Sequence, residues 1–251
     1  MKLSQRLTLL KSIACDAINH NHYDHVWDVC CDHGYLGEAI LENTLLSHKS
    51  DVDTAELTLH FVDIVPHVLD TLEQRLTAQW PAFSRYWQCH CLDGAHLPFN
   101  HYQGRHLVIL AGIGGDLMIH MIQSLLTRYP DLAVDFLLCP VHHQYALREQ
   151  LIRSQLHLQS EELLEENKRF YEVLFVMKNT IKGSDVMPNI PPALTNVGEK
   201  IWHANNEQQL QVMQRYLDKT LAHYKRCAIG GDADAENIVS AYQAVKLQFS
   251  E

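Results

Sequence analysis

The 251-residue sequence has few basic residues for its size, and this shortage limits what it can bind. Lys and Arg total 20 against 30 Asp and Glu, which leaves a formal net charge of −10 with the 17 His neutral. This balance excludes a globally basic nucleic-acid-binding protein, because the summed field repels phosphates. Contact with a nucleic acid would need a local positive patch, to which histidines add charge when a phosphate or a lower pH protonates them.

Long apolar segments are also absent. No apolar run approaches the roughly 18 to 20 residues that span a bilayer, and Lys11 interrupts the one N-terminal stretch that could imitate a secretion signal. The sequence therefore predicts a cytoplasmic protein without a membrane span.

The seven cysteines include no C-x-x-C pair. Cys30 with Cys31, and Cys89 with Cys91 around His90, lack the partners that would complete a tetrahedral zinc site. An odd number of cysteines scattered through apolar segments is typical of reduced, buried thiols. We expect neither a metal nor disulfides.

What the sequence does have is a regular alternation of strand-like and helix-like segments. An N-terminal helix is predicted behind a capping Ser4, and short apolar runs then alternate with segments of helical periodicity. The predicted strands cover 26–31, 57–64, 86–91, 106–111 and 134–138. Such alternation is typical of an α/β fold with a mostly parallel sheet covered on both faces. Segments 156–162 and 170–177 then predict a closing antiparallel hairpin.

The last part of the chain has a different pattern. Gly and Pro punctuate a connector, so we expect one domain over residues 1–180, a linker over 181–197 and a small α-helical hairpin domain over 198–251. Apolar residues at three- and four-residue spacing predict the two helices of that hairpin, the first from Leu210 to Tyr224 and the second from Ile238 to Phe249.

A basic stripe runs along the first of these helices. Arg215, Lys219, His223 and Arg226 fall at i, i+4, i+8 and i+11, opposite the apolar residues. Residues 195–251 hold 6 Lys and Arg and 7 Asp and Glu, so this part carries −1 and the preceding part the remaining −9. The stripe is either an ordinary solvated face or an edge that contacts phosphates.

The clearest local motif is the turn that follows the first predicted strand. The stretch Asp28-Val29-Cys30-Cys31-Asp32-His33-Gly34-Tyr35-Leu36 reads as a strand, a tight turn and the start of a helix. Nucleotide-type ligands bind at such strand exits, and Gly34 allows a close approach of the backbone. Cys30 and Cys31 stand where a dinucleotide fingerprint would have small residues, so the motif does not support G-x-G-x-x-G binding.

Three further turns follow the next predicted strands. Asp63, with Ile64 after it, ends the second strand and can accept hydrogen bonds from ribose hydroxyls. Asp93-Gly94 follows the third strand and could reach an adenine amino group. Ala111-Gly112-Ile113-Gly114-Gly115 follows the fourth and brings backbone close. Each turn alone could be a plain turn, but all four are expected at one edge of the sheet. Since none of them is a phosphate-binding loop, they predict a site for a nucleoside without phosphates. S-adenosylmethionine is the candidate ligand.

These motifs resemble those of the TrmK family, the tRNA (adenine(22)-N1)-methyltransferases. The resemblance rests on Leu3-Ser4-x-Arg6-Leu7, Asp28-x-x-x-Asp32-His33-x-Tyr35-Leu36, Asp93-Gly94, Ala111-Gly112-Ile113-Gly114-Gly115, Leu147-Arg148-x-x-Leu151 and Tyr171-Glu172, and covers most of residues 3–177. It implies a Rossmann-like class I methyltransferase domain with a C-terminal helical hairpin. S-adenosyl-L-methionine would be the methyl donor, and N1 of an adenine in the tRNA D-arm the acceptor.

The strand exits and the resemblance together give candidate site residues. Those expected to bind the cofactor are Arg6, Asp28, Cys30, Asp32, Gly34, Asp63, Ile64, Asp93, Gly94, Ala111, Gly112 and Gly114. Asp32, His33 and Tyr35 are the candidate catalytic residues, although Asp32 could instead cap a helix and Tyr35 could simply pack. Arg6 could contact the cofactor carboxylate or an RNA phosphate, or pair with an acid. The basic stripe, Arg215, Lys219, His223 and Arg226, is the candidate RNA-binding edge.

Some positions differ from the usual family pattern and keep other functions open. The first turn has Cys30-Cys31 where the family commonly has Gly-Ser, Gly34 and Gly37 replace Ala and Pro, and Val141 follows Pro140 in place of Asn. The alternatives are a methyltransferase that acts on a non-RNA substrate, which the acidic charge favours, and a catalytically silent cofactor-binding module whose helical hairpin docks a partner.

Overall fold

A seven-stranded sheet forms the centre of the protein. The computed structural model describes residues 3–47, 57–178 and 194–249. The strands of the sheet are β1 (His25–Val29), β2 (Thr58–Asp63), β3 (Trp87–Cys91), β4 (His106–Ala111), β5 (Val134–Cys139), β6 (Leu156–Glu166) and β7 (Arg169–Lys178). Their order is β3-β2-β1-β4-β5-β7-β6, with β1 to β5 parallel and β7 antiparallel to both of its neighbours. The predicted Rossmann-like α/β sheet with an antiparallel closing hairpin is confirmed.

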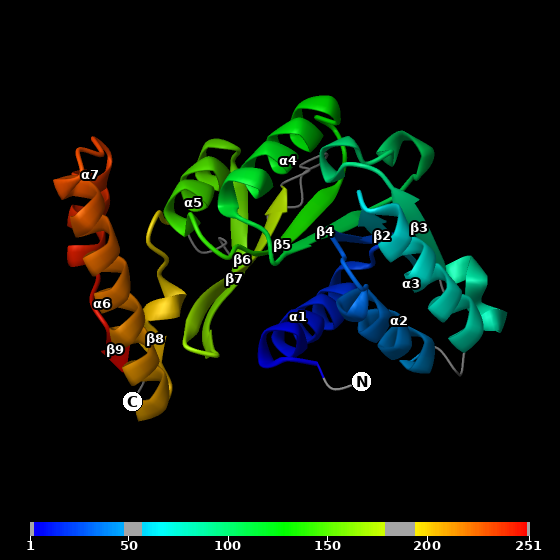
Figure 1. Cartoon of the computed structure of the whole chain (residues 1–251), viewed down its shortest axis with the longest axis horizontal. Helices are drawn as coiled ribbons and strands as arrows, with labels where there is room; N and C mark the ends of the chain where they lie inside the picture. The colour runs from blue at the N-terminus through cyan, green and yellow to red at the C-terminus, as the bar shows by residue number, and fades with distance from the viewer. Residues whose placement is uncertain (1–2, 48–56, 179–193, 250–251) are drawn as a thin grey trace, which may run out of the picture.

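Helices cover both faces of this sheet (Figure 1). On one face lie α1 (Gln5–Asn21), α2 (Tyr35–Ser47) and α3 (Pro66–Gln79), and on the other α4 (Gly115–Arg128) and α5 (Gln144–Arg153). Short 3-10 helices are η1 (Pro81–Tyr86), η2 (Gly94–His96), η3 (Phe99–His101) and η4 (Lys200–Trp202). Because both faces are covered, the central strands are buried and mostly apolar, as Leu107 to Leu110 of β4 show.

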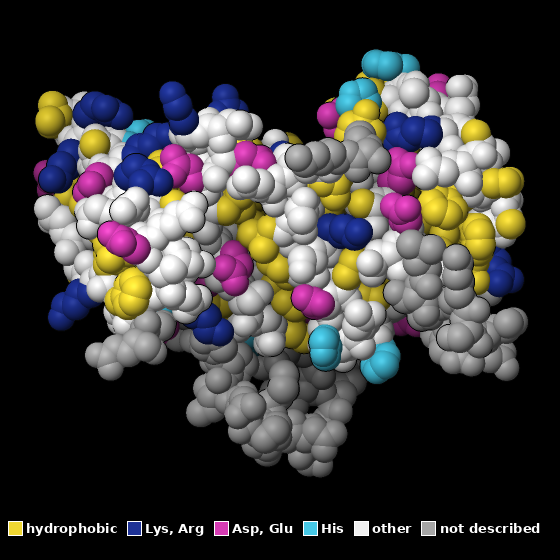
Figure 2. All heavy atoms as spheres, turned by 90° about the horizontal axis from the view of Figure 1, so that it is seen from below, with side chains coloured by type: hydrophobic (Ala, Val, Ile, Leu, Met, Phe, Trp, Pro, Cys, Tyr) yellow, Lys and Arg dark blue, Asp and Glu magenta, His cyan; other side chains and the backbone are white. Residues whose placement is uncertain are grey.

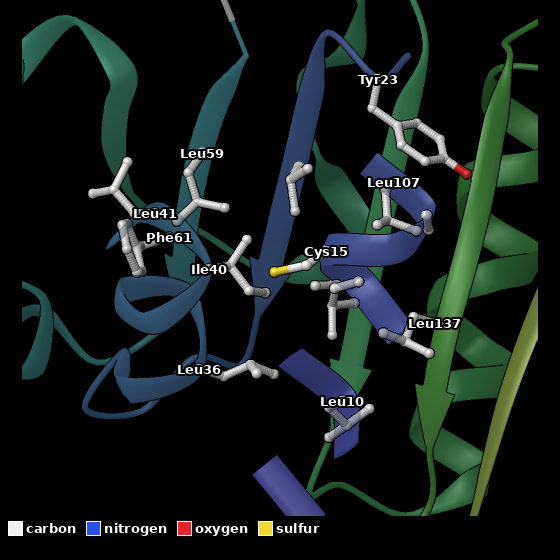
Figure 3. Packing of buried hydrophobic residues seen from close by; sticks show 14 of the residues in the cluster. Leu10, Cys15, Tyr23, Leu36, Ile40, Leu41, Leu59, Phe61, Leu107 and Leu137 are labelled. Atoms are coloured by element: carbon white, nitrogen blue, oxygen red, sulfur yellow. The ribbon is translucent and has the colours of Figure 1, made fainter. Parts of the chain in front are cut away.

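The core beneath α1 and α2 shows how the sequence pattern becomes packing. Leu10 and Cys15 of α1 and Ile40 of α2 point toward the strands, where they meet Phe61 of β2 and Leu137 of β5 (Figure 3). The predicted cap of α1 is present, since Ser4 Oγ accepts a hydrogen bond from the Leu7 N–H at 3.3 Å. This helix therefore begins beside the sheet edge at which β1 to β5 end.

The C-terminal residues form a separate layer beside the closing hairpin (Figure 1). It contains α6 (Glu207–Ile229), α7 (Ala235–Gln243) and a two-stranded parallel pair, β8 (His203–Ala204) with β9 (Gln248–Phe249). The predicted helix from Ile238 to Phe249 is wrong in its second half. The chain leaves α7 at Gln243, and Phe249 belongs to β9 because its backbone pairs with Ala204.

Most of the predicted linker lies outside the described residues. Of residues 181–197, only 194–197 are described, and they contact the first domain through the Thr195 carbonyl, which accepts a hydrogen bond from Arg148 Nη1 at 3.3 Å.

Candidate functional site

The exit of β1 is a tightly bent turn. Cys30, Asp32 and Gly34 all have positive φ angles, of 57°, 50° and 70°. Two of these are non-glycine residues, which adopt the left-handed region only when the surrounding structure holds them there. The Cys31 N–H donates to the Val62 carbonyl at 3.0 Å and the Gly34 N–H to the Cys31 carbonyl at 2.7 Å. The turn is thus fixed to the neighbouring strand β2.

Asp28 lies buried beneath this turn. Its Oδ2 accepts a hydrogen bond from the Gly37 N–H of α2 at 2.9 Å. Burial raises the pKa of Asp28 to about 7, and the nearby Asp63 acts in the same direction, whereas the hydrogen bond from Gly37 opposes the rise. A Cβ on Gly37 would lie 2.8 Å from Asp28 Oδ2 and 2.5 Å from Phe61 Cε1, so glycine is required for this contact.

Asp63, at the end of β2, orders the same turn from the other side. Its Oδ2 accepts from the Asp32 N–H at 3.0 Å, and its Oδ1 accepts from the Val65 N–H at 3.1 Å. Ile64 follows it with 68% of its surface exposed. An ordered carboxylate beside an exposed apolar side chain suits a ribose with a planar base next to it.

The two cysteines of the turn are protonated thiols. Burial, with Asp63 next in importance, raises the pKa of Cys30 to about 11, and burial also raises the pKa of Cys31. Only thiolates are strong nucleophiles, so these side chains act as small, weakly polar packing groups.

The exit of β3 serves mainly as a cap. Asp93 Oδ1 accepts a hydrogen bond from the Ala95 N–H at 2.9 Å, and its Oδ2 lies 3.8 Å from His96 Nδ1. Gly94 is buried, and a Cβ there would lie 2.4 Å from Val29 Cγ1. The Asp93 side chain is half exposed and keeps oxygen lone pairs available to a ligand.

The exit of β4 is joined to the exit of β5. The Gly112 N–H donates to the Cys139 carbonyl at 3.2 Å, and the Gly115 N–H to the His142 carbonyl at 3.0 Å. A Cβ on Gly114 would lie 2.2 Å from His142 Cε1, so the imidazole fills the space that the glycine leaves. Ala111, Gly112 and Gly114 therefore lie beside the end of β5 and the loop after it.

Arg6 of α1 lies at the centre of this junction. A Cβ on Gly112 would lie 3.5 Å from Arg6 Nη1, and Arg6 Cζ lies 5.0 Å from the centroid of the Tyr171 ring. Burial raises the pKa of Cys139 to about 11, and the adjacent Arg6 opposes this rise. The guanidinium is thus a positive group placed between the β4 exit and the start of β7.

The three candidate catalytic residues are exposed at the start of α2. His33 Nε2 lies 3.9 Å from Asp32 Oδ1, and the His33 and Tyr35 rings lie 5.5 Å apart. Arg75 of α3 lies over the Tyr35 ring at 5.1 Å and donates to the His33 carbonyl at 2.6 Å. The structure brings Asp32 to Asp63, whereas Tyr35 packs against Arg75 on the α3 side of the turn.

The basic stripe of α6 divides into residues with different surroundings. Arg215 Nη2 pairs with Glu165 Oε2 of β6 at 2.5 Å. Lys219 and His223 line a cavity between α6, the start of β7 and the loop after β5, and Arg226 is exposed beyond it. Figure 2 shows Lys and Arg side chains gathered over the α6–α7 side of the molecule, with acidic side chains among them.

A buried ionic group joins α6 to the sheet, and no sequence pattern indicated it. Arg148 of α5 has no exposed side-chain surface and donates to Glu172 Oε2 at 2.7 Å and to Glu161 Oε2 at 2.6 Å. The Tyr216 hydroxyl of α6 donates to Glu172 Oε1 at 2.5 Å, and Glu161 Oε1 accepts from the Lys200 N–H at 2.6 Å. Burial alone would raise the pKa of Glu161, but Arg148 and the backbone donors lower it below its ordinary value. Arg148 and Glu172 both lie within motifs that carry the family resemblance.

The described residues show neither a membrane-spanning helix nor a metal-binding cluster. None of their helices has the length and apolar character that crossing a membrane requires. They contain no group of three or more His, Cys, Asp or Glu side chains arranged to hold a metal ion.

Comparisons with known proteins agree with this architecture. The family described as "Methyltransferase domain" matches residues 3–174. None of the curated protein sequences matches the chain.

Several solved structures are similar in fold. Sp1610 of Streptococcus pneumoniae, a proposed tRNA (m1A22) methyltransferase, has a TM-score of 0.68 at 18% identity and covers 96% of this chain and 98% of its own. TrmK of M. capricolum, in complex with S-adenosyl-homocysteine, gives 0.67 at 13% identity over 97% of both chains. The m1A22 tRNA methyltransferase TrmK of B. subtilis gives 0.57 at 17% identity over 96% and 94%. The shared fold extends through α6 and α7.

Proposed function

The chain belongs to the methyltransferase domain family, and we propose that it transfers a methyl group from S-adenosylmethionine to N1 of an adenine in the D-arm of a tRNA. The observation that carries the donor is the joining of four strand exits at one sheet edge, where Asp63 holds the Asp32 backbone and Ile64 lies exposed. The adenine acceptor is supported by two m1A22-type tRNA methyltransferases, Sp1610 of Streptococcus pneumoniae and TrmK of B. subtilis, whose fold this chain shares over nearly its whole length.

The residues at this edge fit the donor. Asp63 and Asp93 offer oxygens for ribose hydroxyls and an amino group, and Ile64 offers an apolar face to the adenine ring. Arg6, beside Gly112, is placed to attract the carboxylate of the methionine part. Asp32 is exposed in the turn, and its negative charge favours binding of the positively charged sulfur of the donor.

Methyl transfer requires the protein to align the reacting atoms more than to act as an acid or a base. The donor supplies a methyl carbon on a positively charged sulfur, and the N1 lone pair of neutral adenine displaces that sulfur, so the positive charge moves to the base and S-adenosylhomocysteine leaves. The protein must hold nitrogen, carbon and sulfur in line and exclude water. Carboxylates near the forming cation stabilise it, which is the role we propose for Asp32, with His33 and Tyr35 as contacts of donor or acceptor.

The target adenine has to leave its stack to reach the sheet edge. The protein would then hold the tRNA at a distance from the reacting base. We propose that Arg215, Lys219, His223 and Arg226 of the C-terminal domain, residues 198–251, provide these phosphate contacts. The linker 181–197 would divide this domain from the methyltransferase domain, 1–180.

A labelling experiment tests this function. Purified protein is incubated with methyl-labelled S-adenosylmethionine and unmodified tRNA, and the labelled nucleotide is located by mass mapping. Label on N1 of a D-arm adenine supports the proposal. Label that reaches only an RNA-free acceptor mixture supports the second candidate, a methyltransferase of small molecules or proteins, which the net charge of −10 favours. Donor binding by calorimetry without transfer to either would identify a silent binding module.

A further inference from the structure

A cavity of about 520 Å³ lies between part of α6 and the sheet domain. Its walls are the loop after β5, the start of β7 and one side of α6, so segments far apart in the sequence form it together. The volume falls within the roughly 300 to 1,000 Å³ of small-molecule sites. None of its lining residues belongs to the exits of β1 to β4, where the donor would bind.

The charge of this cavity differs from that of the chain as a whole. Arg169, Lys219 and three histidines line it, and no Asp or Glu is among the described residues of its walls. The whole chain has 30 acidic and 20 basic residues, so an acid-free lining is a local exception. Such a site favours an anionic ligand.

Aromatic rings complete the lining. Phe170 lies beneath Lys219, whose Nζ is 5.3 Å from the ring centroid. Tyr224 is stacked on Tyr242, with centroids 6.1 Å apart and planes at 16°. Aromatic faces beside cations are the combination that binds single-stranded nucleic acid, because bases stack on the rings and phosphates meet the charges.

The cavity adjoins the donor site through two contacts already described. His142 lines it and fills the space beside Gly114 of the β4 exit, and Tyr171 lines it and lies beneath Arg6, next to Gly112. A bound polynucleotide could therefore place one nucleotide over the β4 exit and the next nucleotide in the cavity.

We infer that this cavity binds an unstacked nucleotide of the RNA substrate, adjacent in the strand to the nucleotide that receives the methyl group. The base stacks against Phe170 and Tyr224, and the phosphate is bound by Arg169, Lys219 and His223. This inference rests on the proposed function for its substrate class, and it assigns binding roles to Arg169, Phe170 and Tyr224 that sequence patterns did not indicate.

Charge reversal with a matched control tests the phosphate contact. The probe is a short, fluorescently labelled, 5′-phosphorylated oligoadenylate, whose binding to the full chain is followed by anisotropy. Lys219→Glu should weaken binding about tenfold. Lys225→Glu makes the same change in net charge on the same helix but lies outside the cavity lining, so it should change binding less than about twofold. Equal effects of the two variants would overturn the inference.

A steric variant tests the cavity itself without changing charge. Thr220, half-buried in the cavity wall, is replaced by Trp to fill the space and by Val as a control of similar size. Thr220→Trp should abolish oligoadenylate binding while leaving calorimetric donor binding and the thermal unfolding midpoint close to those of Thr220→Val. Unchanged oligoadenylate binding in Thr220→Trp would contradict the inference.

The outcomes separate this inference from the proposed function. If the wild-type protein methylates tRNA and Lys219→Glu leaves KM for tRNA unchanged, the function stands and the nucleotide site is wrong. If the wild-type protein methylates no RNA but binds oligoadenylate through Lys219, the nucleotide site stands and the proposed reaction is wrong. Binding of a labelled acidic peptide, with no binding of oligoadenylate, would overturn the nucleotide assignment and indicate a protein partner.

Discussion

Gly34 packs directly against Leu72 of α3. A Cβ at position 34 would lie 2.5 Å from Leu72 Cδ2, and Leu72 has only 1% of its surface exposed, so it has no room to move away. The turn after β1 thus depends on a glycine for its positive φ and for its contact with α3.

Gly34→Ala should therefore destabilise the protein. We expect a loss of about 2 to 4 kcal/mol in the free energy of unfolding, from the left-handed backbone and from overpacking. Gly231→Ala is the matched control, because Gly231 also has a positive φ, of 90°, but a Cβ there meets nothing within 4 Å. It should lose about 1 kcal/mol. Urea unfolding measures the free energy of both variants. Equal losses would show that Leu72 moves aside for the added Cβ.

Asp63→Asn should weaken donor binding. The substitution removes the charge and one of the two acceptors that hold the turn, and loss of charge-assisted hydrogen bonds of this kind costs about 1.5 to 3 kcal/mol, or roughly 10- to 100-fold in affinity. Titration calorimetry with S-adenosylmethionine measures the change. Asp70→Asn, an exposed acid on α3, removes the same charge outside the site and should leave affinity unchanged. Full affinity in Asp63→Asn would remove Asp63 from the donor site.

Arg148→Ala should be severely destabilising. It leaves the buried Glu161 and Glu172 without their counter-ion, and such a loss costs about 3 to 5 kcal/mol. Arg153→Ala removes an arginine of the same helix whose partner, Glu149, lies 3.0 Å away, both side chains being exposed, so it should cost less than about 1 kcal/mol. Thermal unfolding of both variants gives the comparison. A small loss in Arg148→Ala would mean that water reaches the carboxylates.

The protein should lose stability as the pH falls below about 6.5. His60 stacks on Trp27 and contacts His25 and His90 through its two ring nitrogens, at 3.0 and 2.9 Å. Burial lowers the pKa of His60 to about 2, and burial also lowers the pKa of His106 to about 4. In the unfolded chain these groups take up protons below about 6.5, so the unfolded state then binds more protons than the folded state. The stabilising contribution of the neutral rings is thus complete above pH 6.5 and is lost as the pH falls toward the folded-state values.

Asp28 acts with the opposite sign in an overlapping pH range. Its folded-state pKa of about 7 lies above its ordinary value of 3.8, so its contribution falls as the pH rises between these values. Urea unfolding at pH 7.5 and pH 5, repeated with His60→Gln and Asp28→Asn, separates the two effects. His60→Gln should reduce the loss of stability on acidification, and Asp28→Asn should enlarge it. A loss of the same size in wild type and His60→Gln would contradict the assignment to His60.

The fold was predictable because periodicity and strand exits are local properties of the sequence. An apolar run such as 106–111 forms a strand because both faces of the sheet are covered. Asp63 and Asp93 mark the exits of two other strands, and both were visible in the sequence as acids that follow apolar runs. The end of α7 was not predictable in the same way. Val245 and Phe249 continue a four-residue spacing, yet backbone pairing with β8 takes Phe249 out of the helix and leaves it 54% exposed.

The cavity and the buried ionic group depend on tertiary contacts between distant segments. His142, Tyr171 and Lys219 come from three regions of the chain and meet only when β7 packs beside β5 and α6 crosses the hairpin. Arg148 looks like an ordinary exposed arginine of an amphipathic helix until Glu161 and Glu172 are placed around it. Charged residues are buried in this way when their partners come from other elements, which a local pattern does not reveal.

The Arg148 group also limits how far the C-terminal layer can move away from the sheet. Tyr216 ties α6 to Glu172 from within a region closed to water, so parting the C-terminal layer from the sheet would uncover charges whose hydration and pairing must change together. We therefore expect the width of the cavity between the two layers to change little when a ligand binds. Under the proposed function, the RNA rather than the protein would then have to change shape on binding, and RNAs that deform more easily at the bound segment would be better substrates.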